Sequence, residues 1–353
     1  MSPAIPATRR SKALSSQLGL TERIFSSRDD RAMAATIEDG LALVEEGLLR
    51  ELEFADNIAD VTSRYLLSAG GKRVRPMLTL LTAQLGDGNV PAVLAAAQVV
   101  EITHLASLYH DDVMDEAEQR RGVPSAQAVW GNSVAILTGD LLFARASKLV
   151  ASLGERAIIL QADTFERLVL GQLNETAGPQ EGDDPIEHYI EVLANKTGSL
   201  IAAAAQMGVV FSNAAEEYEN AVMLFGERIG VAFQLVDDVI DLSPRADDTG
   251  KVAGTDLRAG VPTLPLLYLR RSALTDPQAA GLLARLEAGI ASDESPEFES
   301  AIAELREHPV TATTLAEAQR WADDAVAALA PLPDGSVKKA LTRFAEAMVE
   351  RSR

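Results

Sequence analysis

The 353-residue sequence contains no cysteine, only four histidines and few aromatic residues. The absence of cysteine excludes disulfides, thiol nucleophiles and zinc–thiolate sites, and four histidines argue against an all-histidine metal centre. Aromatic residues make up 5% of the chain, whereas hydrophobic residues together make up 47%. A core of Ala, Leu, Val and Ile is therefore expected, and this composition favours packed helices over a β-sandwich.

Basic residues are also scarce, because 32 Lys and Arg face 52 Asp and Glu, which gives a net charge of −20. Such an acidic surface repels nucleic acid and anionic lipid, so neither is expected as a partner. Residues 1–33 are polar and lack the apolar stretch of a signal peptide. No window has the ~20 uncharged apolar residues of a transmembrane span. We therefore expect a cytoplasmic protein.

Apolar residues recur at three- and four-residue steps from residue 34 onward, and the alternation typical of strands is missing. The breaks between these periodic segments are short and carry turn residues, and the longest runs from residue 243 to 262. No break is long enough to separate two domains. The sequence therefore predicts an all-α protein with one domain over residues 34–353, preceded by a polar tail or arm over residues 1–33.

Two apolar helices are predicted to end in the same acidic pattern, Asp-Asp-x-x-Asp. One copy occupies residues 111–115 and the other occupies residues 237–241. The other Asp-Asp pairs lack the third aspartate; they lie at 29–30, 183–184, 247–248 and 323–324. A triad that recurs at the end of a strongly apolar helix indicates a function beyond that of a solvated acidic face.

Helical spacing places the outer aspartates of each triad one turn apart on the same face, Asp111 with Asp115 and Asp237 with Asp241. The middle residues of the two triads are rotated away by ~100°. Like charges so close together repel each other and also oppose the helix dipole near a C-terminus, which indicates a bound cation. Oxygen ligands in small number suit Mg²⁺ that is completed by water and phosphate.

Basic residues that could bind phosphate lie in several other segments. Residues 70–76 read Gly-Gly-Lys-Arg-Val-Arg-Pro, a glycine turn followed by three cations, and Arg120 and Arg121 follow the first triad. Lys196 and Lys251 stand in polar segments further along the chain. Each segment alone is a weak signal, because basic helix starts and surface lysines are common. Together they supply guanidinium and ammonium groups for phosphate beside carboxylates for metal.

These motifs resemble those of the trans-prenyltransferases, the polyprenyl diphosphate synthase family. The resemblance follows the family's order over about residues 34–353, nearly the whole chain. It rests on residues 70–76, His104, residues 111–115, Arg-Arg-Gly at 120–122, Gly139-Asp140, Lys196-Thr197, Phe233-Gln234, residues 237–241, Gly250-Lys251, residues 254–257 and Pro-Thr-Leu-Pro at 262–265. Val261 departs from the pattern, because many relatives have a lysine there, and this puts one additional phosphate contact in doubt.

The resemblance implies a fold and a set of metal ligands. The fold would be the isoprenoid synthase fold, a single-domain helical bundle around a deep central apolar cavity, usually as a homodimer. The two triads would face each other across the cavity mouth and bind three Mg²⁺. The metal ligands would be Asp111, Asp115 and Asp237, supported by Asp112, Asp238 and Asp241.

The resemblance also implies two diphosphate sites. The allylic diphosphate would be held by Arg120, Lys196, Thr197, Gln234 and Lys251. The diphosphate of isopentenyl diphosphate would be held by Gly71, Lys72, Arg75, His104 and Arg121. The residues that act directly in catalysis would be Asp111, Asp115, Asp237, Lys196 and Arg120.

The implied reaction is a head-to-tail condensation. Metals and cations would stabilise the departing diphosphate, the double bond of isopentenyl diphosphate would attack the allylic cation, and the released diphosphate would take the final proton. Two alternatives remain from different classes: a class I terpene cyclase, which usually lacks a second full Asp triad, and a non-catalytic partner subunit, which typically has eroded triads.

The helix that carries the first triad also predicts the product length. Residues four and five before Asp111 are Ser107 and Ala106. At one or both of these positions, short-chain relatives commonly have a bulky aromatic residue that blocks further growth of the product chain, which we call a floor. Both side chains here are small, and Thr103 is next on that face. We therefore expect a hexaprenyl to decaprenyl product, such as a quinone side-chain precursor. A floor elsewhere, at Phe143, Leu160 or Phe165, would instead stop growth at geranylgeranyl.

Overall fold

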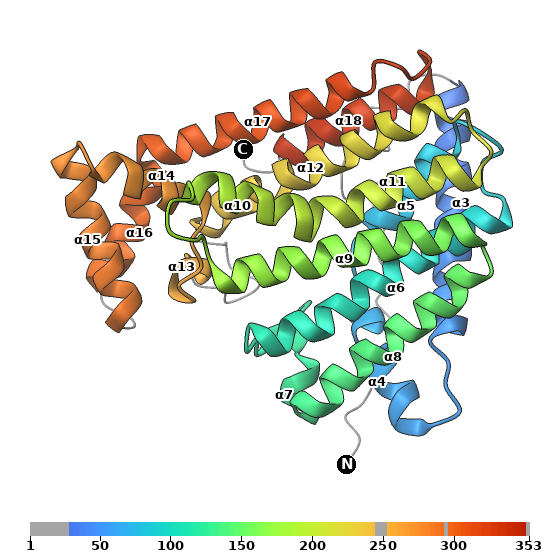
Figure 1. Cartoon of the computed structure of the whole chain (residues 1–353), viewed down its shortest axis with the longest axis horizontal. Helices are drawn as coiled ribbons and strands as arrows, with labels where there is room; N and C mark the ends of the chain where they lie inside the picture. Colours follow the sequence, from blue (N-terminus) through green and yellow to red (C-terminus); the bar gives the residue numbers. More distant parts are fainter. Residues whose placement is uncertain (1–27, 244–252, 293–295, 351–353) are drawn as a thin grey trace. The chain divides into compact units, whose positions relative to one another are not determined.

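The computed structural model describes residues 28–243, 253–292 and 296–350, and within them the chain is almost entirely helical (Figure 1). This confirms the prediction of an all-α protein. The strands in these ranges are β1 (Gln119–Arg120) and β2 (Val123–Pro124), an antiparallel hairpin in which Gln119 lies opposite Pro124. Gly250 and Lys251 lie outside the described residues, as does the polar segment 1–27.

The first half of the described chain begins at Arg28, so the last residues of the segment 1–33 that we interpreted as a tail belong to a helix. Met33 is buried there, because the apolar face of this helix starts at that residue. The helices of this half are α3 (Arg28–Glu51), α4 (Asn57–Ser68), α5 (Val74–Ala83), α6 (Pro91–Met114), α7 (Ala126–Trp130), α8 (Asn132–Ala151) and α9 (Glu155–Ala177).

The second half of the described chain is also a succession of helices. Its elements are α10 (Pro185–Leu193), the π-helical turn η1 (Ala194–Gly198), α11 (Ser199–Phe211), α12 (Glu217–Asp241), α13 (Thr255–Arg258), α14 (Leu264–Ala273), α15 (Pro277–Ser292), α16 (Pro296–Glu307), α17 (Pro309–Ala328) and α18 (Ser336–Glu350).

These elements form two compact units, and each unit is made of segments that are far apart in the sequence. Among the described residues, the first unit holds 28–166, 200–226 and 329–343. The second unit holds Arg167–Ser199, Glu227–Ala328 and the described residues from Phe344 onward. Four boundaries fall inside α9, α11, α12 and α18, and the fifth lies at the end of α17, which is why no linker in the sequence marks them.

The first unit is organised around α6. This helix packs against α3, α5, α7 and α8, and Figure 1 shows it alongside α8. It is apolar on nearly all sides, as expected of a helix at the centre of a bundle. Among the described residues, α6 is also the one helix long and apolar enough to cross a membrane, but 72% of its apolar window is buried within the structure. Burial of this kind is typical of a core helix.

The contact between α5 and α11 in the first unit depends on small residues. The hydroxyls of Thr79 and Thr82 donate to the carbonyl oxygens of Ala204 and Ala205 at 2.9 and 2.8 Å. A Cβ on Gly208 would lie 2.1 Å from the Thr82 Oγ1 atom. The absence of a side chain at Gly208 therefore allows these two backbones to approach each other.

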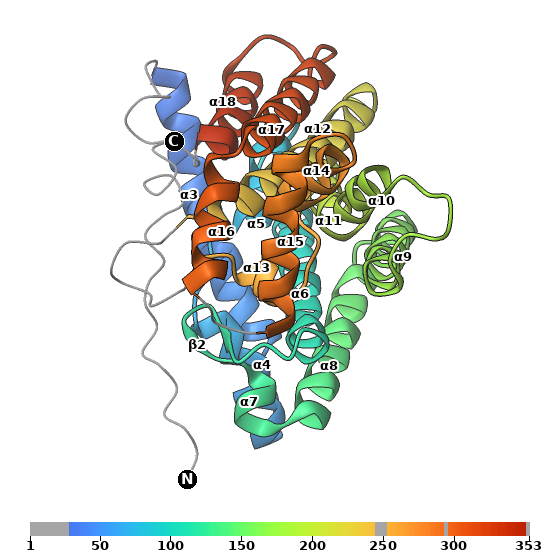
Figure 2. The ribbon, with the colours of Figure 1, turned by 90° about the vertical axis from the view of Figure 1, so that its left-hand side faces the viewer.

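The second unit has an aliphatic core of its own, formed by α13, α14, α15 and α16 around the buried ring of Phe298. Figure 2 shows α15 and α16, which contact each other. A Cβ on Gly289 would lie 2.1 Å from the Phe298 ring. The glycine therefore makes room for the one large side chain at this crossing.

The tight crossing of α5 and α11 generates a stability prediction. The Gly208→Leu substitution should lower the free energy of unfolding by ~2 kcal/mol or more, because the new side chain has no space beside Thr82. Gly281→Ala is the matched control: Gly281 has no neighbouring atom within 4 Å of an added Cβ, so this change should stabilise its helix slightly. Thermal unfolding followed by circular dichroism measures both. Equal melting temperatures for the two variants would contradict the packing argument.

Candidate active site

The first aspartate triad lies at the C-terminal end of α6, where the residues of this helix change from buried to solvent-exposed. Asp111 is half-buried, Asp112 is fully buried and Asp115 is exposed. Asp115 is the C-cap residue, and its backbone N–H donates to the Asp111 carbonyl oxygen at 2.8 Å. The α6 helix therefore places the outer two aspartates one turn apart, as their spacing predicted.

The middle aspartate of this triad faces inward and binds an arginine of the β1–β2 hairpin. The Arg120 Nε atom donates to Asp112 Oδ1 at 2.6 Å. Burial raises the pKa of Asp112, and the nearby positive charge of Arg120 partly offsets that rise. The second carboxylate oxygen, Oδ2, is buried and has no hydrogen-bond partner among the described residues. Asp112 therefore orients Arg120 beside the triad.

The same hairpin brings Arg121 to the glycine turn that precedes α5. Arg121 Nη1 donates to the carbonyl oxygens of Leu66, at 2.7 Å, and Gly70. Gly71 has a φ of +147°, and a Cβ on it would lie 3.0 Å from Arg121 Cζ. Any side chain at Gly71 would therefore separate the turn from this arginine.

Arg75 and His104 lie in the electrostatic field of Arg121, so the structure brings together three of the residues predicted to bind the isopentenyl diphosphate. Burial, together with the nearby positive charge of Arg121, lowers the pKa of Arg75 to about 10, although the negative charge of Glu101 opposes this shift. Burial and then the positive charges of Arg75, Arg121 and Arg120 hold the pKa of His104 well below its usual value. His104 is therefore neutral at pH 7. The Arg75 Nε atom is buried without a hydrogen-bond partner among the described residues, as expected of a group that binds an anion.

The sequence analysis did not single out two carboxylates beside this cluster. Arg73 forms ion pairs with Glu45, at 2.8 Å, and with Glu101, at 3.2 Å. Glu101 is only 2% exposed although it lies in the middle of the apolar α6 helix. An isolated charged residue within that apolar run was the available signal, because a buried carboxylate needs a partner.

The second aspartate triad ends α12 in the second unit, and it repeats the pattern of a buried middle residue. Asp237 is half-buried, whereas Asp238 is 5% exposed. Asp238 accepts hydrogen bonds from the Tyr189 hydroxyl, at 2.8 and 3.0 Å, and from the Leu264 N–H, at 3.1 Å. Burial raises the pKa of Asp238 to about 8, although these hydrogen bonds lower it. Asp238 therefore fastens both α10 and the start of α14 to the end of α12.

Asp241 fastens a different segment. Its Oδ2 atom accepts from the Asp256 N–H at 3.0 Å, and its backbone carbonyl accepts from the Gly254 N–H at 2.7 Å. The segment after residue 253 is thereby tied to the end of α12. Asp238 and Asp241 both contact the protein itself, which agrees with a supporting role beside Asp237.

Lys196 and Thr197 lie in the π-helical turn η1. Such turns are rare and often occur at functional sites. Gly171 of α9 allows the turn to come close, because a Cβ there would lie 2.8 Å from the Lys196 backbone nitrogen. The Lys196 Nζ atom forms an ion pair with Glu175 Oε2 at 2.5 Å. One turn before Glu175, the Gln172 Oε1 atom is buried without a hydrogen-bond partner among the described residues.

Glu175, which pairs with the predicted diphosphate ligand Lys196, was missed by the sequence analysis, as was Gln172, one turn before it on α9. Their helical spacing was visible, but the link to Lys196 depends on the fold. Gln234 is half-buried on α12. Lys251, the remaining predicted ligand of the allylic diphosphate, lies outside the described residues.

The residues predicted to set product length are buried on α6. Ala106 is fully buried, and the Ser107 hydroxyl donates to the His104 carbonyl oxygen at 3.0 Å. One turn further from the triad, Thr103 Oγ1 accepts from the Gln161 side chain at 2.7 Å. The two aromatic candidates for a floor, Phe143 and Phe165, pack against each other with ring centroids 4.4 Å apart.

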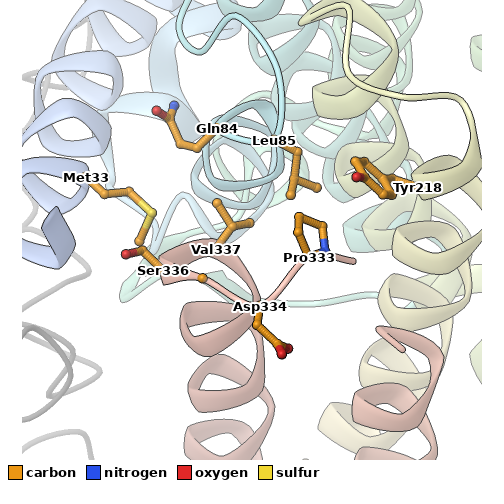
Figure 3. Close-up of a pocket in the computed structure, with 9 residues that line it drawn as sticks. Met33, Gln84, Leu85, Tyr218, Pro333, Asp334, Ser336 and Val337 are labelled. Atoms are coloured by element: carbon orange, nitrogen blue, oxygen red, sulfur yellow. The ribbon is translucent and has the colours of Figure 1, made fainter. Parts of the chain in front are cut away.

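The first unit also contains a pocket of about 380 Å³ away from these residues (Figure 3). Met33, Gln84, Leu85 and Tyr218 line it together with residues 333–337. Asp334 is its one charged lining residue, and it contains none of the predicted site residues. An acidic pocket without cations does not suit a diphosphate.

The carboxylates of the two triads suit magnesium. Among the residues that the structure describes, no three acidic or histidine side chains form a ready-made metal cage. Mg²⁺ does not require one, because it usually keeps several waters and binds one or two carboxylates together with substrate phosphates. The one-turn spacing of Asp111 and Asp115, beside the unpartnered Asp112 Oδ2, fits this kind of site.

Comparison with known proteins identifies the family. The model of the polyprenyl synthetase family matches residues 56–303. The chain is 45% identical over 323 residues to a nonaprenyl diphosphate synthase from Mycobacterium tuberculosis, covering 91% of this chain and 95% of that protein. The chain belongs to the polyprenyl synthetase family.

Solved structures agree with this family and with its isoprenoid synthase fold. A decaprenyl diphosphate synthase from Rhodobacter capsulatus superposes with a TM-score of 0.79 at 32% identity, covering 92% of this chain and 99% of that chain. A geranylgeranyl pyrophosphate synthase from Corynebacterium glutamicum, complexed with calcium and isoprenyl diphosphate, gives a TM-score of 0.79 at 41% identity, covering 93% and 99%. The chain is thus a prenyltransferase of this fold, as its motifs predicted.

The different environments of the two neighbouring aspartates in the second triad generate a prediction. Asp238→Ala should lower the melting temperature by several degrees, because it leaves the Leu264 N–H and the Tyr189 hydroxyl without an acceptor. Asp237→Ala, the matched control, should lower the melting temperature less than Asp238→Ala and instead abolish activity. Calorimetry and a diphosphate-release assay measure the two properties. A stable Asp238→Ala protein would show that this carboxylate does not fasten α14.

Proposed function

We propose that this prenyltransferase is a magnesium-dependent polyprenyl diphosphate synthase with a medium- or long-chain product. It would join isopentenyl diphosphate to an allylic diphosphate head to tail. The observation that carries this proposal is the presence of two complete aspartate triads together with a half-buried cluster of cations, Arg75, Arg120 and Arg121. The carboxylates suit metal-bound diphosphate, and the cations of the first unit suit a second diphosphate that needs no metal.

The residues divide into two groups in this proposal. Asp111, Asp115 and Asp237 would hold the metal ions at the allylic diphosphate, as the family resemblance implies. Arg120, Lys196, Thr197, Gln234 and Lys251 would bind the same group. Gly71, Lys72, Arg75, His104 and Arg121 would bind the diphosphate of the isopentenyl substrate.

The protein's own residues orient the two substrates and stabilise charge. Magnesium, when bound, would stabilise the negative charge that develops on the leaving diphosphate. Arg120 is held ready for the same purpose by Asp112. His104 is neutral, because its pKa is lowered, so it would donate a hydrogen bond to diphosphate without adding charge. The released diphosphate would take the proton that ends the reaction, which agrees with a chain that has no cysteine.

Product length is proposed from the α6 residues and from relatives. Ala106 and Ser107 give no bulky floor one turn before the triad, which supports a chain longer than geranylgeranyl. The nonaprenyl and decaprenyl synthases similar to this chain support the same conclusion. A geranylgeranyl product is the second candidate, because the Phe143–Phe165 pair could block the growing prenyl chain within the first unit. A 41% identical relative is also named a geranylgeranyl pyrophosphate synthase.

A cytoplasmic homodimer is part of the same proposal. Exposed apolar side chains on α9 support a partner copy, because such residues at helical spacing often mark an interface; they are Ile158, Ile159, Val169, Leu170 and Leu173. The acidic composition, with a net charge of −20, supports a location away from anionic membrane surfaces. Sedimentation of the purified chain at twice the monomer mass is the expected result.

The metal assignment gives a direct prediction. Asp111→Ala should reduce turnover by at least about a hundredfold with little change in melting temperature, because it removes a ligand of the charge-stabilising metal. Asp323→Ala, at an exposed aspartate of α17, is the control and should retain full activity. Steady-state release of diphosphate from an allylic substrate and isopentenyl diphosphate is the measurement. Near-normal turnover in Asp111→Ala would contradict the assignment of Asp111 as a metal ligand.

The product-length assignment gives a second prediction. Ala106→Phe should shorten the product by several isoprene units, because the new ring lies one turn, ~5.4 Å, below the triad. Leu108→Phe is the matched control on another side of α6 and should leave the length unchanged. Chromatography of the dephosphorylated products compares the variants with the wild type. An unchanged product from an active Ala106→Phe enzyme would show that the growing chain does not pass this residue.

A further inference from the structure

Glu101 is a carboxylate that the proposed reaction does not use and that the fold nevertheless buries. It lies on α6 one turn before His104, and it is 2% exposed. Apart from Glu101, the sequence of α6 from Pro91 to Tyr109 contains no acidic or basic residue other than His104. Burial of a carboxylate in such surroundings is unfavourable unless cations compensate it.

Arg73 provides the first compensation, and its contacts are all with the protein. Its Nη1 atom donates to Glu101 Oε1 at 3.2 Å, and its Nε and Nη2 atoms donate to Glu45 at 2.8 and 2.9 Å. It also donates to the carbonyl oxygens of Gly70 and Leu67, both at 3.2 Å. Arg73 is only 8% exposed, so its guanidinium is committed to these partners and is unsuited to bind substrate.

Arg73 has an unusual backbone conformation, which its ion pairs must hold in place. Arg73 has a φ of 51°, in the left-handed region, where a residue with a side chain is strained. It is also the N-cap residue of α5, between the Gly70-Gly71 turn and Arg75. The bonds to Glu101 and Glu45 therefore hold a strained junction, and that junction sets the position of the residues on both sides of it.

Glu101 also acts on the two cations beyond Arg73. Its negative charge raises the pKa of Arg75 and of Arg121, against the lowering that burial causes in both. Arg121 is close enough to Arg75 and Arg73 for their charges to repel it. Before a diphosphate arrives, Glu101 is thus the buried anion that all three arginines share.

We propose that Glu101 is a positioning residue for the diphosphate of the isopentenyl substrate, acting by its charge and through Arg73 on the Gly70–Arg75 segment and on Arg121. This inference rests on the proposed function, because it assumes that Arg75 and Arg121 bind that diphosphate. Glu101 does not touch the substrate. It keeps the two binding arginines together and the glycine turn closed, so that the site is formed before substrate binds.

Glu101→Gln is the direct test, because it removes the charge and keeps the shape. The KM for isopentenyl diphosphate should rise by about tenfold or more, while the KM for the allylic diphosphate and kcat should each stay within about threefold. Arg73→Lys is the second variant, because it keeps the charge but loses the planar fork of donors, and the same selective rise is expected. Glu46→Gln is the control: Glu46 is the exposed neighbour of Glu45 on α3, so the KM should change by less than about threefold.

Arg75→Ala separates this inference from the proposed function. If Arg75→Ala raises the KM for isopentenyl diphosphate but Glu101→Gln and Arg73→Lys do not, the assignment of Arg75 to the isopentenyl diphosphate site is supported. The proposed positioning role of Glu101 is then wrong. If Arg75→Ala leaves that KM unchanged, the assignment of the site itself fails and the inference fails with it. An equal rise in both KM values in Glu101→Gln would indicate general loss of structure and would also overturn the inference.

Discussion

The structure depends on the cost of burying charge in an aliphatic bundle. A carboxylate or guanidinium in such surroundings is tolerated only where opposite charges or hydrogen bonds satisfy it. Three buried carboxylates meet this requirement, two through an arginine and one through hydrogen bonds. Glu101 pairs with arginine, Asp112 pairs with Arg120, and Asp238 accepts from Tyr189 and from a backbone N–H. Glu101 and Asp112 each contact a segment that carries predicted site residues, and Asp238 holds α10, which continues into the turn η1 that carries Lys196.

In both aspartate triads the middle and outer residues have different environments, because helix geometry points their side chains in different directions. The middle aspartate turns inward and is buried, and it binds a neighbouring element of its own unit. The outer residues Asp111 and Asp237 are half-buried and remain suited to bind metal. One short motif would therefore supply both a metal ligand and a contact that holds nearby residues in place. The two adjacent aspartates would then have different roles.

Helical periodicity and motif spacing were enough to predict the all-α fold and the one-turn separation of Asp111 and Asp115. The family resemblance, rather than spacing, was the basis for assigning Arg75, His104 and Arg121 to one site, and the structure brings these three residues near one another. The sequence could not show that Arg73, among three neighbouring cations, turns inward, since that depends on its left-handed backbone. The partner of Lys196 was hidden for a related reason: Glu175 lies on another helix. The two units were also invisible, because their boundaries fall inside or at the end of continuous helices.

The reaction of the purified wild-type chain with radiolabelled isopentenyl diphosphate, an allylic diphosphate and Mg²⁺ tests the central claim most directly. The account predicts that diphosphate release requires both substrates and the metal, and that labelled prenyl diphosphates longer than geranylgeranyl accumulate. Release of diphosphate from the allylic substrate alone, with a cyclic hydrocarbon as product, would identify a terpene cyclase instead. A folded chain that forms no product without a second, different subunit would also contradict the account.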